Sequence, residues 1–205
     1  MATETELKLG IDPESVDTLL RHPILQSKPK QQHLYNTYFD TNDLALTRQK
    51  VAVRERRTDQ QTLLTIKTAG QSRNGLSQRL EWEGPTTPGA FDFKALVDDV
   101  ALAESLSRNA SQLVPIFSTD FERLAWRVTV EDSLVEVALD RGSIRVRRRG
   151  RQATMPICEL ELELKSGDPA ALSLLANQLQ TQVALKPLDK SKAARGYALF
   201  HDLAA

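Results

Sequence analysis

The chain has 205 residues, a length typical of one globular domain, and its formal net charge is zero. This charge balance excludes bulk electrostatic attraction to nucleic acid or to an anionic membrane as the basis of function. Cys158 is the only cysteine, which excludes an internal disulfide and fits a reducing compartment. The sequence contains no apolar run that could span a bilayer and no visible secretory signal, so we expect a cytoplasmic protein.

The N-terminal segment alternates charged residues with others, which predicts a strand. Glu4, Glu6 and Lys8 would share one face of this strand, with Leu7 and Leu9 on the opposite face. Neighbouring charges on that face would lie about 7 Å apart, a spacing that suits a site for a cation and an anion together. Taken alone, the same pattern also fits an edge strand in water.

Capping signals and helical spacing predict a small number of helices. Asp12-Pro13 and Asp168-Pro169 each place a capping residue before a first-turn proline, which predicts that a helix begins there. Residues 91–108 have apolar residues at helical spacing and predict two short helices. Residues 190–203 predict a last helix, or a strand that leads into a helix.

Alternation of charged and apolar residues predicts strands along much of the remaining chain. We expect residues 114–123 and 125–131 to form a hairpin, and the two segments after it to turn at Asp140-Arg141-Gly142. The predicted strands after the N-terminal one are residues 33–39, 49–57, 62–68, 78–84, 114–123, 125–131, 133–139, 143–148 and 154–165.

The polar faces of these strands consist almost entirely of Glu, Arg and Lys. A flat antiparallel sheet with one face in water is one arrangement that accommodates them. A closed antiparallel barrel is the other, with its apolar face outside under the helices and its charged face lining a water-filled bore. Buried charges persist when they are paired, hydrated or bound to a ligand, so a bore with both signs suits a polyanion chelated to a metal.

Acidic and basic residues in this bore predict two kinds of ligand contact. Glu4 and Glu6 on one strand would meet Glu161 and Glu163 on another, and oxygen ligands of this kind favour Mg²⁺ or Mn²⁺. The sequence has no phosphate-binding glycine loop, so phosphate binding would rest on side chains. The basic residues that we expect to surround a linear phosphate chain are Lys8, Arg54, Arg56, Lys67, Arg79, Arg123 and Lys192.

Several short motifs follow one another along almost the whole chain. They are Glu4-x-Glu6-x-Lys8, Tyr38-Phe39-Asp40-Thr41, Val53-Arg54-Glu55-Arg56, Thr65-Ile66-Lys67, Arg79-Leu80-Glu81, the alternating acids of residues 159–163, and Ser191-Lys192-Ala193-Ala194-Arg195-Gly196-Tyr197. This ordered set resembles the CYTH superfamily, also called triphosphate tunnel metalloenzymes. Residues 117–121 and 156–163 are similar to the bacterial inorganic triphosphatases in which CYTH precedes a helical CHAD domain.

The resemblance implies an α+β fold: a closed eight-stranded antiparallel barrel, or tunnel, with a charged interior and about four to six flanking helices. It implies one CYTH domain over residues 1–205, with no CHAD domain in this sequence. It also implies hydrolysis of inorganic triphosphate to pyrophosphate and orthophosphate with Mg²⁺ or Mn²⁺.

The resemblance assigns roles to named residues. The metal ligands would be Glu4, Glu6, Glu161 and Glu163, supported by Glu159, Glu81 and Asp140. The triphosphate contacts would be the seven basic residues named above. Lys8 would also orient or deprotonate the attacking water, which makes Lys8, Glu4 and Glu6 the catalytic group.

Alternatives stay open for the function. They are thiamine triphosphatase, nucleoside triphosphatase or adenylate cyclase activity on the same fold, and a non-catalytic module that binds polyphosphate. We expect a monomer or weak homo-oligomer, with inorganic triphosphate, another triphosphate or short polyphosphate as ligand, and no nucleic-acid or membrane partner. The basic run of residues 145–151 is interpreted as a solvated hairpin tip.

Overall fold

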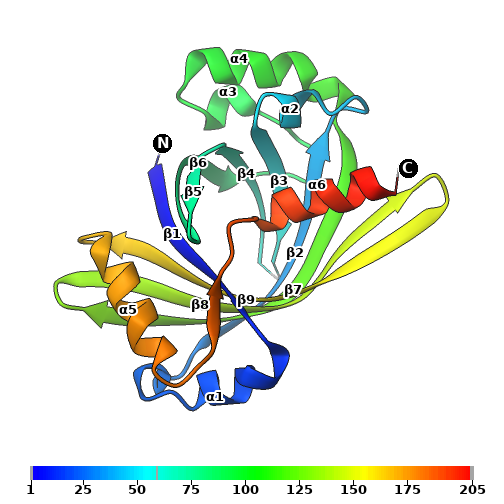
Figure 1. Cartoon of the computed structure of the whole chain (residues 1–205). Coiled ribbons are helices and arrows are strands. Elements are labelled where there is room, and N and C mark those ends of the chain that lie inside the picture. The colour runs from blue at the N-terminus through cyan, green and yellow to red at the C-terminus, as the bar shows by residue number, and fades with distance from the viewer. Residues whose placement is uncertain (1, 59, 204–205) are drawn as a thin grey trace.

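The computed structural model describes residues 2–58 and 60–203. Eight antiparallel strands close into a barrel at its centre, and Figure 1 shows how the helices lie around it. Around the ring the strands follow the order β1-β9-β8-β7-β2-β3-β4-β6, and pairing of β6 with β1 closes it. The ring strands are β1 (Ala2–Ile11), β2 (Lys30–Asp40), β3 (Val51–Arg57), β4 (Thr62–Thr68), β6 (Leu76–Pro85), β7 (Val114–Val130), β8 (Ser133–Arg148) and β9 (Arg151–Ser166). The short strands β5 (Gln71–Arg73) and β10 (Leu185–Pro187) pair with β6 and β1.

The two hairpins predicted between residues 114 and 148 were wrong. Strand β7 runs unbroken for 17 residues and β8 for 16, and the two pair along nearly their whole length. Gly142, expected in a turn, lies inside β8 where β7 comes very close. A Cβ at this position would lie 2.1 Å from the carbonyl oxygen of Asp120. The glycine therefore marks a close approach of two backbones rather than a chain reversal.

Helices cover the outside of the barrel, as expected, with the exception of the last one. The α-helices are α1 (Val16–Leu20), α2 (Ala45–Arg48), α3 (Phe93–Leu96), α4 (Val100–Asn109), α5 (Ala170–Gln180) and α6 (Lys192–Asp202), with single 3-10 turns η1 (Pro13–Ser15), η2 (Pro23–Leu25) and η3 (Ala110–Gln112). The segment at residues 190–203 is thus a helix, preceded by the short strand β10. None of the described helices is long and apolar enough to cross a bilayer.

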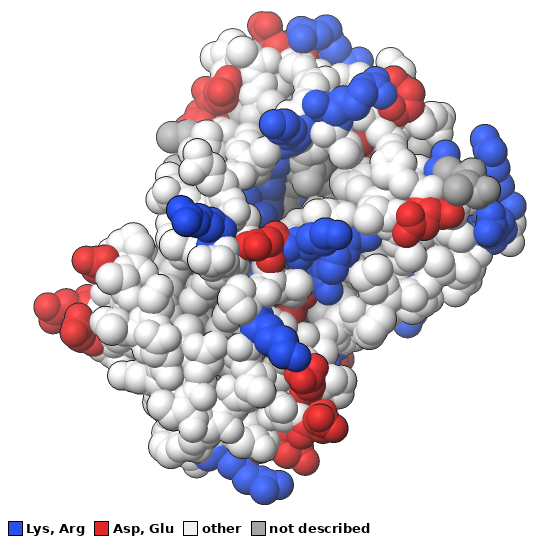
Figure 2. Space-filling model, in the orientation of Figure 1, with Lys and Arg blue, Asp and Glu red and all other residues white. Residues whose placement is uncertain are grey.

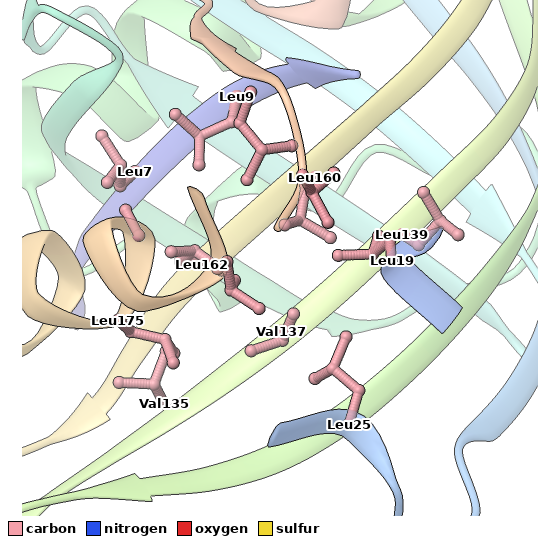
Figure 3. Close-up of a cluster of buried hydrophobic side chains, with 14 of the residues drawn as sticks. Leu7, Leu9, Leu19, Leu25, Val135, Val137, Leu139, Leu160, Leu162 and Leu175 are labelled. Carbon is pink, nitrogen blue, oxygen red and sulfur yellow. The ribbon is translucent and has the colours of Figure 1, made fainter. Parts of the chain in front are cut away.

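The apolar faces of the strands are buried under these helices. Leu9, Val137 and Leu160 point outward from the barrel into a cluster with Leu175 of α5 (Figure 3). A second cluster places Trp82 of β6 beneath α3 and α4. Each such aliphatic side chain contributes about 1.5–3 kcal/mol when it is fully buried. The outer clusters therefore hold the barrel wall in place and leave the opposite strand faces for the interior.

Helix α6 differs from the other helices because it packs on the inner side of the long strands. Its Tyr197 and Phe200 cluster with Ile144 of β8 and Ile157 of β9. Ile144 lies four residues from Asp140 on β8, so both side chains point to the same face. The inner face of the long strands is therefore charged along one stretch and apolar along the next, where α6 covers it.

Candidate active site

The interior of the barrel is a polar cavity of about 1040 Å³. All eight ring strands and the start of α6 contribute residues to its wall. Figure 2 shows acidic and basic side chains gathered around a hollow in the middle of the molecule. On β1, Glu4, Glu6 and Lys8 line the cavity while Leu7 and Leu9 lie in the outer core, as the alternation predicts.

Glu4 is the centre of one group of ion pairs, at the junction of β1, β4 and β6. Its carboxylate accepts hydrogen bonds from Lys67 Nζ at 2.9 Å and from Arg79 Nε at 2.7 Å. Arg79 lies directly opposite Glu4 in the β1–β6 register, and its guanidinium also contacts Glu6. Lys67 lies opposite Glu81 and pairs with it at 2.9 Å. Burial raises the pKa of Glu4, but Lys67 and Arg79 outweigh it and hold that pKa well below its usual range.

A second group of ion pairs joins β7, β8, β9 and α6. Lys192, the first residue of α6, donates to Asp140 at 2.6 Å, to Glu159 at 2.5 Å and to Glu161 at 3.0 Å. Arg123 donates to both Asp140 and Glu161. Burial alone would lower the pKa of Lys192, but these three carboxylates raise it above its ordinary value. Lys192 therefore keeps its proton at neutral pH without a ligand.

Lys8 connects the two groups. Its ammonium donates to Glu6 at 2.6 Å and lies 3.9 Å from Glu161, and the residue is only 3% exposed. Strands β1 and β9 pair in the register that brings Lys8 opposite Glu161. One network of charges consequently runs across the barrel from β4 to α6.

The wall formed by β2 and β3 carries an excess of positive charge. Arg54 donates to Thr65 at 3.0 Å and to Glu83 at 3.3 Å, while Arg56 donates its Nε hydrogen to Asn36 at 3.1 Å. Burial, together with the nearby guanidinium groups of Arg54 and Arg123, lowers the pKa of Arg56 to about 10. Crowding of cations in a buried site favours an anionic ligand.

The acids predicted to bind metal do not all meet at one point. Among the described residues, Asp140, Glu159 and Glu161 form a compact group with carboxylate oxygens within 4.8 Å of one another, but Lys192, Arg123 and Arg195 already contact them. Glu163 lies apart from this group and pairs with Lys165 at 2.7 Å.

Glu4, Glu81 and Glu163 also line the cavity, and the charge of Glu4 acts on the other two. Burial raises the pKa values of Glu81 and Glu163, and the negative charge of Glu4 adds to both effects. A bound divalent cation would relieve this repulsion, and a donor set made only of oxygen atoms suits Mg²⁺ or Mn²⁺. The acids that line the cavity are therefore compatible with a metal.

Several residues of the site were not singled out by sequence reasoning. Glu83 and Glu136 line the cavity, and each shares a strand face with a residue that was chosen, so alternation could have identified both. Asn36 is neutral, so a pattern based on charged residues does not identify it. Arg195, named above only as part of the last motif, pairs with the buried Glu159.

A closed antiparallel barrel with paired acids and bases in its bore defines the structural class of triphosphate tunnel proteins. The CYTH domain family matches residues 2–197, and the chain belongs to this family. An inorganic triphosphatase of Haemophilus influenzae is 36% identical over 201 residues, which are 97% of this chain and 55% of that protein. The chain thus spans about half the length of this curated relative.

Solved structures with low sequence identity share the fold. A putative adenylyl cyclase from Hippeastrum, described as having a dominant triphosphatase activity, matches with a TM-score of 0.66 at 20% identity, over 97% of this chain and 95% of that one. The PH1819 protein of Pyrococcus horikoshii matches with a TM-score of 0.59 at 18% identity, over 96% and 99% of the two chains. At these identities the likeness concerns the fold alone.

Proposed function

We propose that this chain is a metal-dependent triphosphatase domain that hydrolyses inorganic triphosphate to pyrophosphate and orthophosphate inside the barrel. The observation that carries the proposal is the cavity itself, where Lys and Arg side chains line a bore that also holds several carboxylates. The 36% identity to an inorganic triphosphatase over nearly the whole chain supports this choice of substrate.

The cations of the bore bind and orient the phosphate chain. Guanidinium groups match phosphate oxygens in a two-pronged geometry, and those of Arg54, Arg79 and Arg123 are held by carboxylates or hydroxyls before the ligand arrives. Lys67 and Lys192 add positive point charges at opposite sides of the cavity. Because these groups are fixed in advance, they stabilise the charge of the transition state with little reorganisation.

Glu4, Glu6, Glu161 and Glu163 would hold Mg²⁺ or Mn²⁺, with Glu81 also in the cavity wall. A bound divalent ion neutralises phosphate charge and makes water a stronger nucleophile. Lys8, fixed by Glu6 at 2.6 Å, is positioned to orient the attacking water. We therefore propose that Lys8, Glu4 and Glu6 form the catalytic group, and that the remaining basic residues bind substrate.

The test is phosphate release from inorganic triphosphate, ATP and thiamine triphosphate, each with Mg²⁺, Mn²⁺ or EDTA. We expect metal-dependent turnover with inorganic triphosphate as the best substrate. Glu4→Gln should reduce kcat by at least about 100-fold, since it removes a metal-binding charge, and Glu122→Gln, at an exposed position of β7, should retain activity. Tight triphosphate binding by calorimetry without turnover in any condition would instead show a polyphosphate-binding module.

A further inference from the structure

Arg56 differs from the other basic residues of the bore in having a neutral partner. Its Nε hydrogen bonds to the side-chain oxygen of Asn36 at 3.1 Å, and its terminal amino groups donate to no described residue. Asn36 in turn donates its amide hydrogen to Thr119 Oγ1 at 2.9 Å. Asn36 and Thr119 are 1% and 0% exposed, so both are inside the barrel wall, while Arg56 is half-buried and lines the cavity.

The remaining cations predicted to bind phosphate all have carboxylate partners. Lys8 pairs with Glu6, Arg54 with Glu83, Lys67 and Arg79 with Glu4, and Arg123 and Lys192 with Asp140. Within the described part of the chain, Arg56 has no ion pair. It is consequently the one cation in this set with no carboxylate in contact, and the charge of Glu83 acts on it only from a longer distance.

An amide at position 36 has a different effect from a carboxylate. The amide oxygen accepts one hydrogen bond and so fixes the plane of the guanidinium, but it leaves the positive charge uncompensated. A carboxylate at the same place would fix the plane equally well and neutralise the charge. Retaining a buried cation without a counter-ion is costly unless a ligand supplies the negative charge.

We infer that Asn36 is a positioning residue that holds Arg56 oriented without placing a carboxylate in contact with it, so that Arg56 anchors the phosphate chain of the substrate. The inference rests on the proposed function and adds the residue that sets where the negative charge of the ligand is bound. Arg54 and Arg123, whose positive charges reach Arg56, complete this binding region opposite the acidic strands.

The decisive variant is Asn36→Asp, which changes the charge and almost nothing else. Aspartate has the shape of asparagine, it can accept from Arg56, and the Thr119 hydroxyl can turn to donate to it. If Asn36 does not act through Arg56, any loss of binding comes from direct repulsion of triphosphate and should be the same with and without Arg56. If Asn36 keeps Arg56 available, the variant should be as stable but bind triphosphate poorly.

Binding is measured by calorimetry with inorganic triphosphate in EDTA, and kcat and KM are measured with metal. For Asn36→Asp we expect a Kd and a KM at least about tenfold higher, a kcat changed by less than about threefold, and an unchanged urea midpoint. Asn36→Ala, which keeps the charge and loses the orientation, should raise Kd by only about threefold. Asn177→Asp makes the same chemical change at an exposed position of α5 and should behave like the parent.

A double-mutant cycle tests whether Asn36 affects triphosphate binding through Arg56. Arg56→Gln should weaken binding by itself, and Asn36→Asp should add little in that background, because the residue it neutralises is gone. If Asn36→Asp does not fold, the cycle with Asn36→Ala answers the same question. Parental binding affinity in Asn36→Asp, or additive effects in the cycle, would overturn the inference. Failure of the parent protein to bind or hydrolyse triphosphate would instead overturn the proposed function.

Discussion

Glu161 lies at the most crowded point of the charge network. Its carboxylate contacts Lys192 and Arg123, and Lys8 lies 3.9 Å away. Burial raises the pKa of Glu161, but these cations outweigh it and hold the pKa well below the ordinary value of 4.5. The ionised form is thus favoured by folding, and the stability that it contributes depends on pH.

We therefore predict a pH-dependent effect of Glu161→Gln on stability. At neutral pH the variant should lose about 3 kcal/mol in the free energy of unfolding, because Lys192 and Arg123 lose a buried partner. Since the folded pKa is below the unfolded value of 4.5, this contribution is complete above that pH and declines as pH falls.

Urea unfolding of both proteins between about pH 3 and pH 8 measures this difference. Glu122→Gln serves as the control, because its side chain is exposed on β7. A difference between parent and Glu161→Gln that is constant over the whole range would contradict the prediction.

At the scale of elements, α6 is fixed at both ends. Lys192 and Arg195 bind its first turn to Glu159, and Arg148 of β8 places its guanidinium 4.1 Å from the ring centre of Phe200 and donates to the Phe200 carbonyl. Two arginines of the basic hairpin, Arg148 and Arg151, thus bond to carbonyls at the end of the helix, where positive charge is favourable. The turn of this hairpin lies where the sequence predicted it.

The close approach of β7 and β8 leads to a prediction for Gly142. An added methyl group at Gly142 would overlap the backbone of Asp120 and Phe121, so Gly142→Ala should lower the free energy of unfolding by at least about 3 kcal/mol. Gly10→Ala is the matched control within a strand, because its Cβ would lie 3.7 Å from the nearest atom, and it should change stability by less than about 0.5 kcal/mol. Urea unfolding of both variants provides the comparison, and equal small effects would contradict the prediction.

At the scale of the whole molecule, the formal net charge is zero, but charged and apolar residues lie in different parts of the barrel. Charged residues of both signs lie inside the barrel and neutralise one another, while apolar residues form the outer wall beneath the helices. The barrel can therefore fold without ligand, and a polyanion bound with a metal adds further compensation.

This arrangement predicts that triphosphate and a divalent metal raise the melting temperature cooperatively. At a triphosphate concentration 100 times Kd, binding should stabilise the fold by about 2.7 kcal/mol, which corresponds to roughly 5–10 °C for a protein of this size. Triphosphate with Mg²⁺ should raise Tm more than the sum of the separate effects, and high salt should reduce the shift. Calorimetric scans with Glu4→Gln as control measure this, and simple additivity of the two shifts would contradict it.

Much of the site could be predicted from the sequence because side chains on a strand alternate strictly between two faces. This rule needs no knowledge of strand pairing, and it places Glu4, Glu6 and Lys8 on one face of the strand with Leu7 and Leu9 on the other. In the structure these faces are the inside and the outside of the barrel. Residue types then indicated oxygen ligands for a metal and guanidinium groups for phosphate, and the ordered motifs indicated the family.

Only the tertiary structure decided which charges meet. The length of β7 and β8, the place of Gly142 between them, and the inward packing of α6 all depend on pairings between residues far apart in the chain. The separation of Glu163 from Asp140, Glu159 and Glu161, and the neutral partner of Arg56, follow from the register and stagger of the closed barrel. Alternation specifies the face of each strand but not its neighbours, because strand pairing is a long-range contact that local periodicity does not contain.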